Sequence, residues 1–378
     1  MSPGAGRTAL VTASSVVSKV AAAHAAEADA ARGPVTTVVD AVVEAGFARH
    51  MVPAAHGGAA GGFGELVRAV AEVGRGCASA AWFASLCAAV GRMAAYLPAE
   101  GRAEVWADGP DAVLVGGLLP AGTAEPVAGG WRLSGRWPYV SGVAVADWAL
   151  LCGKTAEETP SAKFFAVPKG TFEIIDTWHT VGMRGTGSHS LALEDVFVPA
   201  HRALDTADLM AGTAPDAAAA CHSVPLKAAN GITLAAPALG AGSAVLTRWS
   251  DLLSAKLAKQ GQTVISGPVD RTGIDLTFAR SAGEIDLAEL LLTRVAEVAD
   301  SGAVPPELVA RNQRDCALAV ELLSGAVDRL FRSAGSTAQD EGDVLARGWR
   351  DVAGIAGHSG LQFTAGATAY ARLVLSGG

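Results

Sequence analysis

The chain has 378 residues, of which half are hydrophobic and 17% are charged. This length exceeds what one hydrophobic core usually organises and predicts two or three domains. The formal net charge is 29 − 37 = −8 without a run of like charges, which excludes the basic surface of a nucleic-acid-binding protein and predicts no attraction to anionic membranes. The low fraction of charged residues indicates that part of the protein surface is buried between subunits.

The five cysteines are widely spaced, odd in number and without a CxxC pair. This pattern predicts reduced thiols in a cytoplasmic protein without a zinc or iron–sulfur site. The N-terminal segment lacks a continuous apolar run with a cleavage pattern, so we expect no signal peptide. Gly, Pro or charge interrupts each apolar window, so we expect no segment of about 18 to 20 apolar residues that spans a bilayer.

Residues 1–108 are predicted to be all-helical, with a glycine-rich connection over 51–65. The apolar residues recur at helical spacing, and Gly or Pro ends each run. The predicted helices cover 8–31, a short segment that Gly46 ends, a segment from about Phe63, then 79–96 and 99–106.

Residues 109–202 are predicted to form a β domain. Six short runs alternate with a two-residue period or are rich in β-branched residues, and Gly, Pro and charge clusters separate them. So many short strands in sequence indicate a barrel or a sandwich. The runs are DAVLVGGLLP, VAGGWRLSGRW, ADWALLCG, AKFFAVPKG, FEIIDTWHTVGM and SLALEDVFVP.

Residues 203–378 return to helical periodicity. Three long apolar-patterned segments with short connections imply a helix bundle, and Pro305-Pro306 marks the start of the third segment while Gly335 marks its end. The predicted helices cover 222–257, 276–300, 305–335, 341–356 and 360–374.

The stretch WRLSGRWPYVSGVAVADWALLCG, residues 131–153, gathers aromatics, glycines and a serine between two strand patterns. Pro138 and Gly142 interrupt the alternation, which lets backbone and the small hydroxyl of Ser141 approach a flat ligand closely. On its own the stretch is more typical of an ordinary hairpin or bulge whose tryptophans belong to the core.

Several motifs follow one another along the chain: VPAAHGGAAGGFGE, CASAAWFAS, GRWPYVSGVAVADWALLCG, GMRGTGSHSLALEDVFVPAHR, and LFRSAGS followed by LARGWRDVAGIAGH. In this order, and with the helical, β, helical sequence of elements, they resemble the acyl-CoA dehydrogenase fold and, within it, the reduced-flavin-dependent hydroxylases, the oxygenase components of two-component monooxygenases. The resemblance spans nearly the whole chain and implies an α+β fold with a helical domain, a central β-barrel or sandwich and a C-terminal four-helix bundle. It also implies a homotetramer or dimer.

The resemblance implies a flavin between the β domain and the bundle. Ser141 resembles the residue that hydrogen-bonds flavin N5, where a donor or acceptor in a dry pocket slows loss of the N5 proton and of peroxide from a C4a-hydroperoxyflavin. Tyr139 and Gly142 would lie beside the ring, and Trp82 would wall it, although a helix tryptophan is as readily a core residue.

Two further cofactor contacts are implied by the same resemblance. Gly335 resembles a glycine that lets backbone approach the flavin, and it also suits a plain helix C-terminus. Arg271, which we expect in a loop, resembles a basic residue that reaches the flavin of a neighbouring subunit. Val90 stands near a position where related hydroxylases often have histidine, which suggests a larger and more apolar substrate pocket.

His358 is the candidate catalytic residue, because the pattern in WRDVAGIAGH resembles the family's C-terminal active-site element. An imidazole titrates near neutrality and can deprotonate or position a phenol oxygen. The alternative is a histidine that caps a helix C-terminus. We expect Arg350 and Asp351 to form a structural pair and the RGTGS loop, residues 184–188, to lie near the substrate entrance.

These features predict an oxygenase component that uses FADH2 or FMNH2 and O2 to hydroxylate a small aromatic substrate, a phenol or a polycyclic compound. The resemblance implies a separate reductase that supplies the reduced flavin. We expect no nicotinamide site on this chain, in keeping with the absence of a GxGxxG unit after a strand. An acyl-CoA dehydrogenase or oxidase, or an N- or S-oxygenase on the same fold, is the alternative chemistry. A non-catalytic helical interaction protein is the alternative of a different class.

Overall fold

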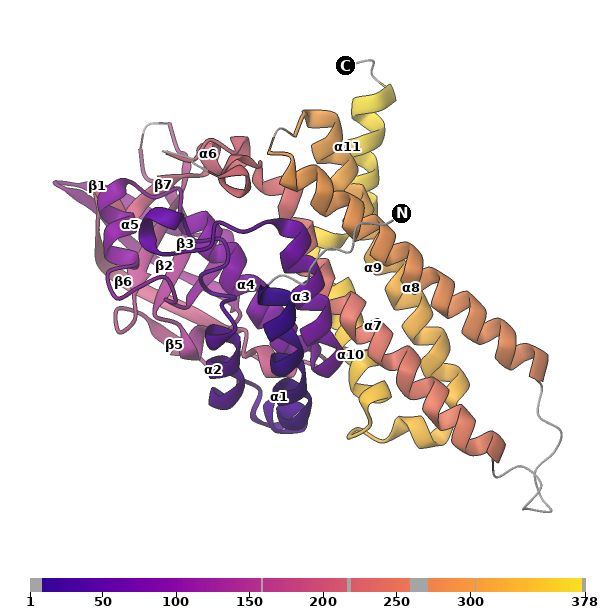
Figure 1. Ribbon diagram of the computed structural model, residues 1–378. Helices are drawn as coiled ribbons and strands as arrows, with labels where there is room; N and C mark the ends of the chain where they lie inside the picture. The colour runs from indigo at the N-terminus through magenta and orange to yellow at the C-terminus, as the bar shows by residue number, and fades with distance from the viewer. Residues whose placement is uncertain (1–8, 158, 216–218, 259–270, 303, 376–378) are drawn as a thin grey trace.

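The computed structural model describes residues 9–157, 159–215, 219–258, 271–302 and 304–375. Their elements follow the predicted helical, β, helical order (Figure 1). The sheet lies at one end, the N-terminal helices lie in the middle and the long C-terminal helices extend away from the sheet. The predicted fold class is confirmed, whereas the domain boundaries at 108 and 202 stay a prediction.

The N-terminal part consists of helices whose small side chains allow close packing. Gly74 of α3 and Gly240 of α7 meet so closely that a Cβ on Gly240 would lie 2.1 Å from the carbonyl oxygen of Ala71. This contact seats α3 and the adjoining α4 against α7. The helices are α1 (Ala9–Ala31), α2 (Thr36–Glu44), α3 (Phe63–Gly76), α4 (Ala78–Ala94) and α5 (Ala99–Val105).

The β part is one seven-stranded mixed sheet with the order β5-β6-β2-β1-β3-β4-β7. Neighbouring strands are antiparallel except β1 and β3, which are parallel. The strands are β1 (Leu114–Val127), β2 (Gly130–Val140), β3 (Trp148–Thr155), β4 (Ala162–Pro168), β5 (Glu173–Ile175), β6 (His189–Pro199) and β7 (Ala203–Asp205).

The sheet curls so that strands distant in its order pack face to face. Trp131 of β2 meets Phe165 of β4 edge-on, with ring centroids 5.8 Å apart, although β1 and β3 lie between these strands. Trp137 is fully buried inside the curl and donates a hydrogen bond to the carbonyl oxygen of Cys152 over 2.6 Å. Gly122 leaves room for the Trp137 ring, because a Cβ there would lie 2.2 Å from it.

The fifth predicted run was too long, because only Glu173–Ile175 of FEIIDTWHTVGM pair as a strand. Asp176 instead accepts two hydrogen bonds from the Arg32 guanidinium, over 2.7 and 2.9 Å. The Trp178 indole N–H donates to the carbonyl oxygen of Met183 over 3.1 Å. These side-chain contacts hold residues 176–183 against the helices as an ordered loop.

The C-terminal part is built on three long helices, α7, α8 and α9, with α10 against α7 and α9 and with α11 against α9. Pro237 lies inside α7. The helices are α6 (Thr206–Ala211), α7 (Leu226–Ala258), α8 (Arg271–Asp300), α9 (Pro306–Ala334), α10 (Val344–Ala356) and α11 (Phe363–Leu375).

Two of the described helices, α1 and α7, are long and apolar enough to cross a membrane by length and composition alone. The expectation that no window approaches this length was wrong for them. In the apolar window of α7, 72% of the residues are buried inside the protein, and in that of α1, 39% are buried. Because the buried core helix of a soluble protein passes the same test, these helices are weak evidence for a membrane span.

Candidate functional site

Side chains from three parts of the chain meet at the junction of helices and sheet. The indole N–H of Trp82, on α4, donates a hydrogen bond to Oγ of Ser141, which follows β2, over 3.1 Å. The Trp82 ring lies 5.6 Å from the imidazole of His358, which follows α10, and the rings are tilted by 58°. Three of the residues expected at the site are therefore brought together.

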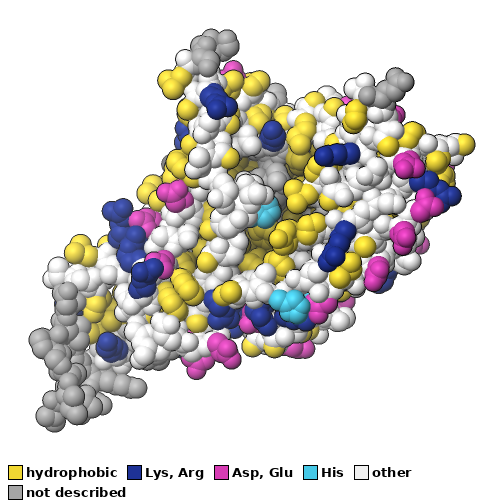
Figure 2. Space-filling model, turned by 180° about the vertical axis from the view of Figure 1, so that it is seen from behind, with side chains coloured by type: hydrophobic (Ala, Val, Ile, Leu, Met, Phe, Trp, Pro, Cys, Tyr) yellow, Lys and Arg dark blue, Asp and Glu magenta, His cyan; other side chains and the backbone are white. Residues whose placement is uncertain are grey.

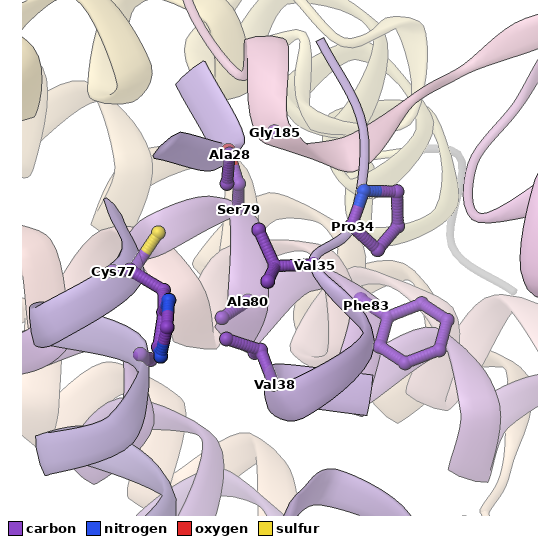
Figure 3. Close-up of a pocket in the computed structure, with 11 residues that line it drawn as sticks. Ala28, Pro34, Val35, Val38, Cys77, Ser79, Ala80, Phe83 and Gly185 are labelled. Carbon is purple, nitrogen blue, oxygen red and sulfur yellow. The ribbon is translucent and has the colours of Figure 1, made fainter. Parts of the chain in front are cut away.

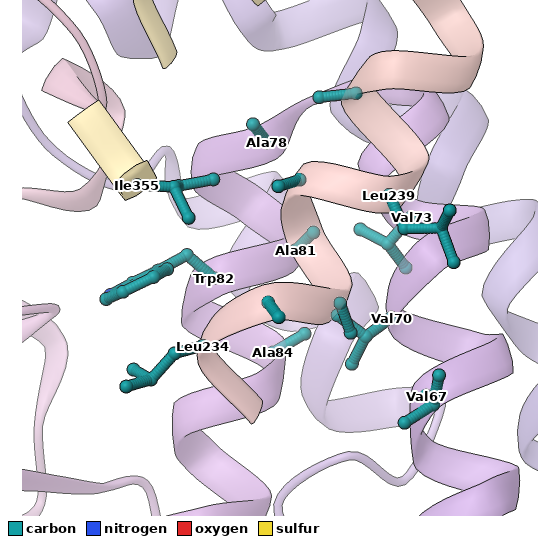
Figure 4. Packing of buried hydrophobic residues seen from close by; sticks show 14 of the residues in the cluster. Val67, Val70, Val73, Ala78, Ala81, Trp82, Ala84, Leu234, Leu239 and Ile355 are labelled. Atoms are coloured by element: carbon teal, nitrogen blue, oxygen red, sulfur yellow. The ribbon is translucent and has the colours of Figure 1, made fainter. Parts of the chain in front are cut away.

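An apolar wall surrounds Trp82. Figure 4 shows Leu234 of α7 and Ile355 of α10 on the same side of the helices as Trp82 and on the opposite side from Val70. Trp82, Leu234 and Ile355 are all buried. The indole is thus held between helices of the N-terminal and C-terminal parts of the chain.

The backbone after Trp137 brings Ser141 to this junction. The pairing of β2 with β6 shifts register between Trp137 and Val140, and Tyr139 takes a left-handed conformation with φ +63°. Gly142 also has a positive φ, +73°, and a Cβ there would lie 2.8 Å from the ring of Phe83. The predicted interruption of the strand is present, and glycine is required at 142 for both reasons.

Behind Ser141 lies a row of buried hydroxyls from the loop between β5 and β6. Oγ of Ser141 is 2.7 Å from Oγ of Ser188, which is 2.6 Å from Oγ1 of Thr186. The Thr186 hydroxyl donates to the carbonyl oxygen of Met183 over 2.8 Å. Thr186 ends the 3₁₀ turn η3 (Arg184–Thr186), which the left-handed Met183 precedes.

This loop was expected near the substrate entrance, but Thr186 and Ser188 are 1% and 4% exposed. Sequence reasoning therefore missed both residues as part of the site. The hydroxyl residues alternate at 186, 188 and 190, but Thr186 lies in a 3₁₀ turn and Gly187 is left-handed, so the two-residue spacing of an extended strand could not predict this contact.

Asp351 of α10 fixes the same loop. Its Oδ1 accepts a hydrogen bond from the backbone N–H of Met183 over 2.6 Å. Burial raises the pKa of this carboxyl to about 6. The expected pairing of Arg350 with Asp351 was wrong, because the Arg350 guanidinium lies 3.3 Å from the carboxylate of Asp29 on α1.

His358 caps a helical turn, though not in the way the sequence suggested. Its Nδ1 accepts the backbone N–H of Gly360 over 3.1 Å, so it caps the N-terminus of the 3₁₀ turn η7 (Ser359–Leu361) rather than the C-terminus of α10. Burial lowers the pKa of the imidazole, which favours the neutral ring. In a neutral ring whose Nδ1 accepts, the proton is on Nε2, which is then a hydrogen-bond donor.

Two other predicted cofactor residues, Tyr139 and Gly335, form no hydrogen bond or ring contact with Trp82, Ser141 or His358 in the part of the chain that the structure describes. Tyr139 is 68% exposed and touches the edge of the Trp178 ring. Gly335 ends α9 with φ +83°, and the 3₁₀ turn η6 (Ser336–Gln339) separates it from the start of α10. Nothing lies within 4 Å of a Cβ placed on Gly335.

Arg271 was expected in a loop but is the first residue of α8, where it is exposed and lies 3.0 Å from the carboxylate of Asp275. This end of α8 is at the tip of the bundle away from the sheet (Figure 1). Val90 fills the interface between α4 and the sheet in a cluster with Leu114 and Leu150. Neither Arg271 nor Val90 is brought to Ser141 within this chain.

The described part of the chain has hollows of different size and lining. Figure 2 shows a depressed region of one face with apolar side chains and a histidine in it. The cavity in Figure 3 has a volume of only about 10 Å³ and is lined by Val35, Cys77, Phe83 and Gly185, so it has room for about one water molecule. A larger groove, of about 590 Å³, runs between α9, α10 and α11.

The residues at the Trp82–Ser141–His358 junction fit a flavin ring. A hydroxyl has two acceptor lone pairs and one proton, so Ser141 keeps one hydrogen-bonding position for a ligand after its contacts with Trp82 and Ser188. Apolar side chains flank this buried oxygen and exclude water. Among the described residues no group of three or more His, Cys, Asp or Glu side chains has the geometry of a metal site.

Family models match two parts of the chain. The N-terminal domain of acyl-CoA dehydrogenase matches residues 7–104, and the C-terminal domain of acyl-CoA dehydrogenase matches residues 232–363. A relative, the oxygenase component of an FADH(2)-dependent resorcinol hydroxylase from Rhizobium sp., is 33% identical over 345 residues, which cover 85% of this chain and 83% of that protein.

Solved structures agree with this assignment. The crystal structure of 3-HSA hydroxylase from Rhodococcus sp. covers 98% of this chain and 97% of its own, with a TM-score of 0.91 at 26% identity. XiaF from Streptomyces sp., in complex with FADH2 and glycerol, covers 97% and 95%, with a TM-score of 0.87 at 28% identity. The chain belongs to the acyl-CoA dehydrogenase family and, within it, to the flavin-dependent oxygenase components.

Proposed function

We propose that this chain is the oxygenase component of a two-component flavin-dependent monooxygenase that hydroxylates an aromatic substrate. The observation that carries the proposal is the convergence of Trp82, Ser141 and His358 in an apolar junction between the sheet and the helices. The relatives are named as reduced-flavin-dependent hydroxylases, and a solved neighbour holds FADH2. The cofactor is thus reduced flavin, FADH2 or FMNH2, with O2 as the co-substrate.

The chemistry supplied by a bound reduced flavin is the two-electron activation of O2. Ser141 would bind the N5 edge of the ring, and Trp82 would wall the ring while it holds the Ser141 oxygen in place. Tyr139 and Gly142 lie on either side of Ser141 in the chain and would lie beside the flavin ring. The buried surroundings keep water from the reacting atoms.

We assign His358 to the substrate oxygen. Because Nδ1 accepts from Gly360, the neutral ring presents Nε2–H, which can donate a hydrogen bond to a phenolic oxygen and orient the ring. This geometry supports positioning by a hydrogen bond in place of proton abstraction by Nδ1. Charge that develops on the substrate oxygen would strengthen such a bond.

Further parts of the proposal concern partners. The name "oxygenase component" of the relatives supports a separate reductase that supplies the reduced flavin. A homotetramer or dimer is supported by an exposed apolar stripe on α8, where Leu276, Leu287 and Leu290 are 66%, 53% and 66% exposed. We propose that another copy covers this stripe and that Gly335 and Arg271 approach a flavin across that interface.

A cytoplasmic location is supported by the cysteines, all five of which are buried free thiols.

The proposed assembly of several chains through the α8 stripe can be tested by light scattering. Leu287→Glu on α8 should lower the mass from that of several chains toward that of one, whereas an unchanged mass would contradict the role of this stripe.

The function itself is tested by turnover with a reductase or with chemically reduced flavin. Purified protein, FADH2 or FMNH2 and air are combined with a panel of phenols and polycyclic aromatics, and hydroxylated product is measured by mass spectrometry with ¹⁸O2. Incorporation of one labelled oxygen atom is expected. Failure to bind either reduced flavin under anaerobic conditions would overturn the proposal.

A further inference from the structure

Three hydroxyls form a continuous line that ends on a backbone carbonyl. Ser141, Ser188 and Thr186 are 7%, 4% and 1% exposed, and successive oxygens are 2.7 and 2.6 Å apart. Oγ1 of Thr186 then lies 2.8 Å from the carbonyl oxygen of Met183. No ionisable side chain belongs to the line.

The carbonyl sets the direction of every bond in this line. A carbonyl oxygen only accepts, so the single proton of Thr186 points to Met183. Oγ1 of Thr186 must then accept from Ser188, whose proton is consumed there. Oγ of Ser188 must in turn accept from Ser141.

The remaining capacity of Ser141 follows by counting. Its proton is directed to Ser188, and one of its two lone pairs accepts the N–H of Trp82. Ser141 therefore has one free lone pair and no free proton. Toward a ligand it is a hydrogen-bond acceptor only.

We propose that this line of hydroxyls makes the site selective for reduced over oxidised flavin, with Ser188 and Thr186 as positioning residues. The inference rests on the proposed function, in which Ser141 faces flavin N5. Reduced flavin carries a hydrogen on N5 and can donate it to Ser141. Oxidised flavin has a lone pair on N5, which would face the lone pair of Ser141 without a proton between them.

Removal of the Ser188 hydroxyl should alter this selectivity. In Ser188→Ala the proton of Ser141 has no protein acceptor and can turn to N5 of oxidised flavin. The dissociation constant of oxidised FAD, measured by titration of flavin fluorescence, should fall about fivefold, the value of one ordinary hydrogen bond. That of reduced FAD, measured anaerobically, should stay within about twofold. A general loss of packing would weaken both.

Thr186 offers a second variant and its own control. In Thr186→Val the Ser188 proton loses its acceptor and turns to Ser141, which should tighten oxidised FAD and weaken reduced FAD. Thr186→Ser keeps the hydroxyl and should retain the wild-type ratio of the two dissociation constants. Ser190→Ala removes a buried hydroxyl that pairs with Thr177 and not with Ser141, so it should also retain the wild-type ratio.

An oxidised flavin analogue with C–H in place of N5 tests whether Ser141 faces that atom. The wild-type protein should bind 5-deaza-FAD more tightly than oxidised FAD, and Ser188→Ala should reverse the order. Equal affinities in the wild type, or an unchanged ratio of oxidised to reduced affinity in both Ser188→Ala and Thr186→Val, would overturn the inference while flavin binding stands. A protein that binds neither form of FAD would overturn the proposed function as well.

Discussion

Trp82 and Ser141 are joined by a hydrogen bond of 3.1 Å between the indole N–H and Oγ, although 59 residues separate them in the chain. Trp82 belongs to a helix of the N-terminal part, and Ser141 directly follows strand β2 of the sheet. His358, from the C-terminal part, completes the group by its ring contact with Trp82. The candidate site therefore exists only when all three parts of the chain are docked.

Trp82→Phe keeps an aromatic ring at this junction but removes the N–H donor. Ser141 then has a second free lone pair and is less firmly oriented. We expect reduced-flavin affinity to fall about fivefold, the loss of one hydrogen bond, with little change in secondary structure by circular dichroism. Affinity equal to that of the wild type would show that the indole N–H does not position Ser141 for the ligand.

Ser141→Ala removes the proposed contact to flavin N5. Less of the reduced flavin consumed should end in hydroxylated product and more in hydrogen peroxide, both of which can be quantified in one assay. Ser134→Ala is a matched control, because Ser134 lies on the same strand, is exposed and only accepts the backbone N–H of Asp195. A product-to-peroxide ratio that Ser141→Ala leaves unchanged would remove Ser141 from the mechanism.

His358→Ala should also lower hydroxylation and raise peroxide release, because the substrate oxygen loses its hydrogen-bond donor. His358→Gln restores an N–H donor and should recover part of the coupling. In the wild type burial lowers the pKa of the half-buried imidazole, so the ring should gain a proton only as pH falls below the ordinary histidine value of about 6.5. Protonation keeps the Nε2–H donor but stops Nδ1 from accepting the Gly360 N–H, so coupling should decline there because the ring loses its orientation. Unchanged coupling in His358→Ala would contradict any role of this residue.

Asp351→Asn tests the buried carboxylate that holds Met183. The folded-state pKa of Asp351 is about 6 against an ordinary 3.8, so between these values the folded protein binds more protons than the unfolded chain. The free energy of unfolding of the wild type, relative to Asp351→Asn, should therefore fall as pH rises from about 4 to about 6, by up to about 3 kcal/mol.

The asparagine keeps an oxygen that can accept the Met183 N–H, so the comparison isolates the charge. Urea unfolding of both proteins across this pH range provides the measurement. A difference that is independent of pH would show that Asp351 does not titrate in this range.

The architecture was predicted from the sequence, and three residues predicted for the site, Trp82, Ser141 and His358, lie together in the structure. Helical spacing and two-residue alternation are strong in this chain, and the Pro138–Gly142 interruption indicated where Ser141 leaves the strand. The contacts of residues 176–183 were not predicted. Asp176 and Trp178 form hydrogen bonds with Arg32 and Met183, which lie outside the sheet, and a two-residue alternation does not reveal such partners.

The hydroxyl line was also outside the reach of sequence reasoning. RGTGS indicates a turn, and only the left-handed Met183 and the following 3₁₀ turn direct Thr186 and Ser188 inward. The pairing of Arg350 with Asp29 joins residues 321 positions apart in the chain, whereas adjacent residues on a helix, such as Arg350 and Asp351, do not face each other.

The line of hydroxyls ends on the carbonyl oxygen of Met183, so the direction of its hydrogen bonds does not change with pH. A line that ended on a carboxylate or an imidazole would reverse its protons whenever that group changed charge. A peptide carbonyl neither gains nor loses a proton in the range where His358 and Asp351 titrate. The acceptor character of Ser141 is therefore insulated from the pH of the surroundings, and any pH response of catalysis has to arise elsewhere in the pocket.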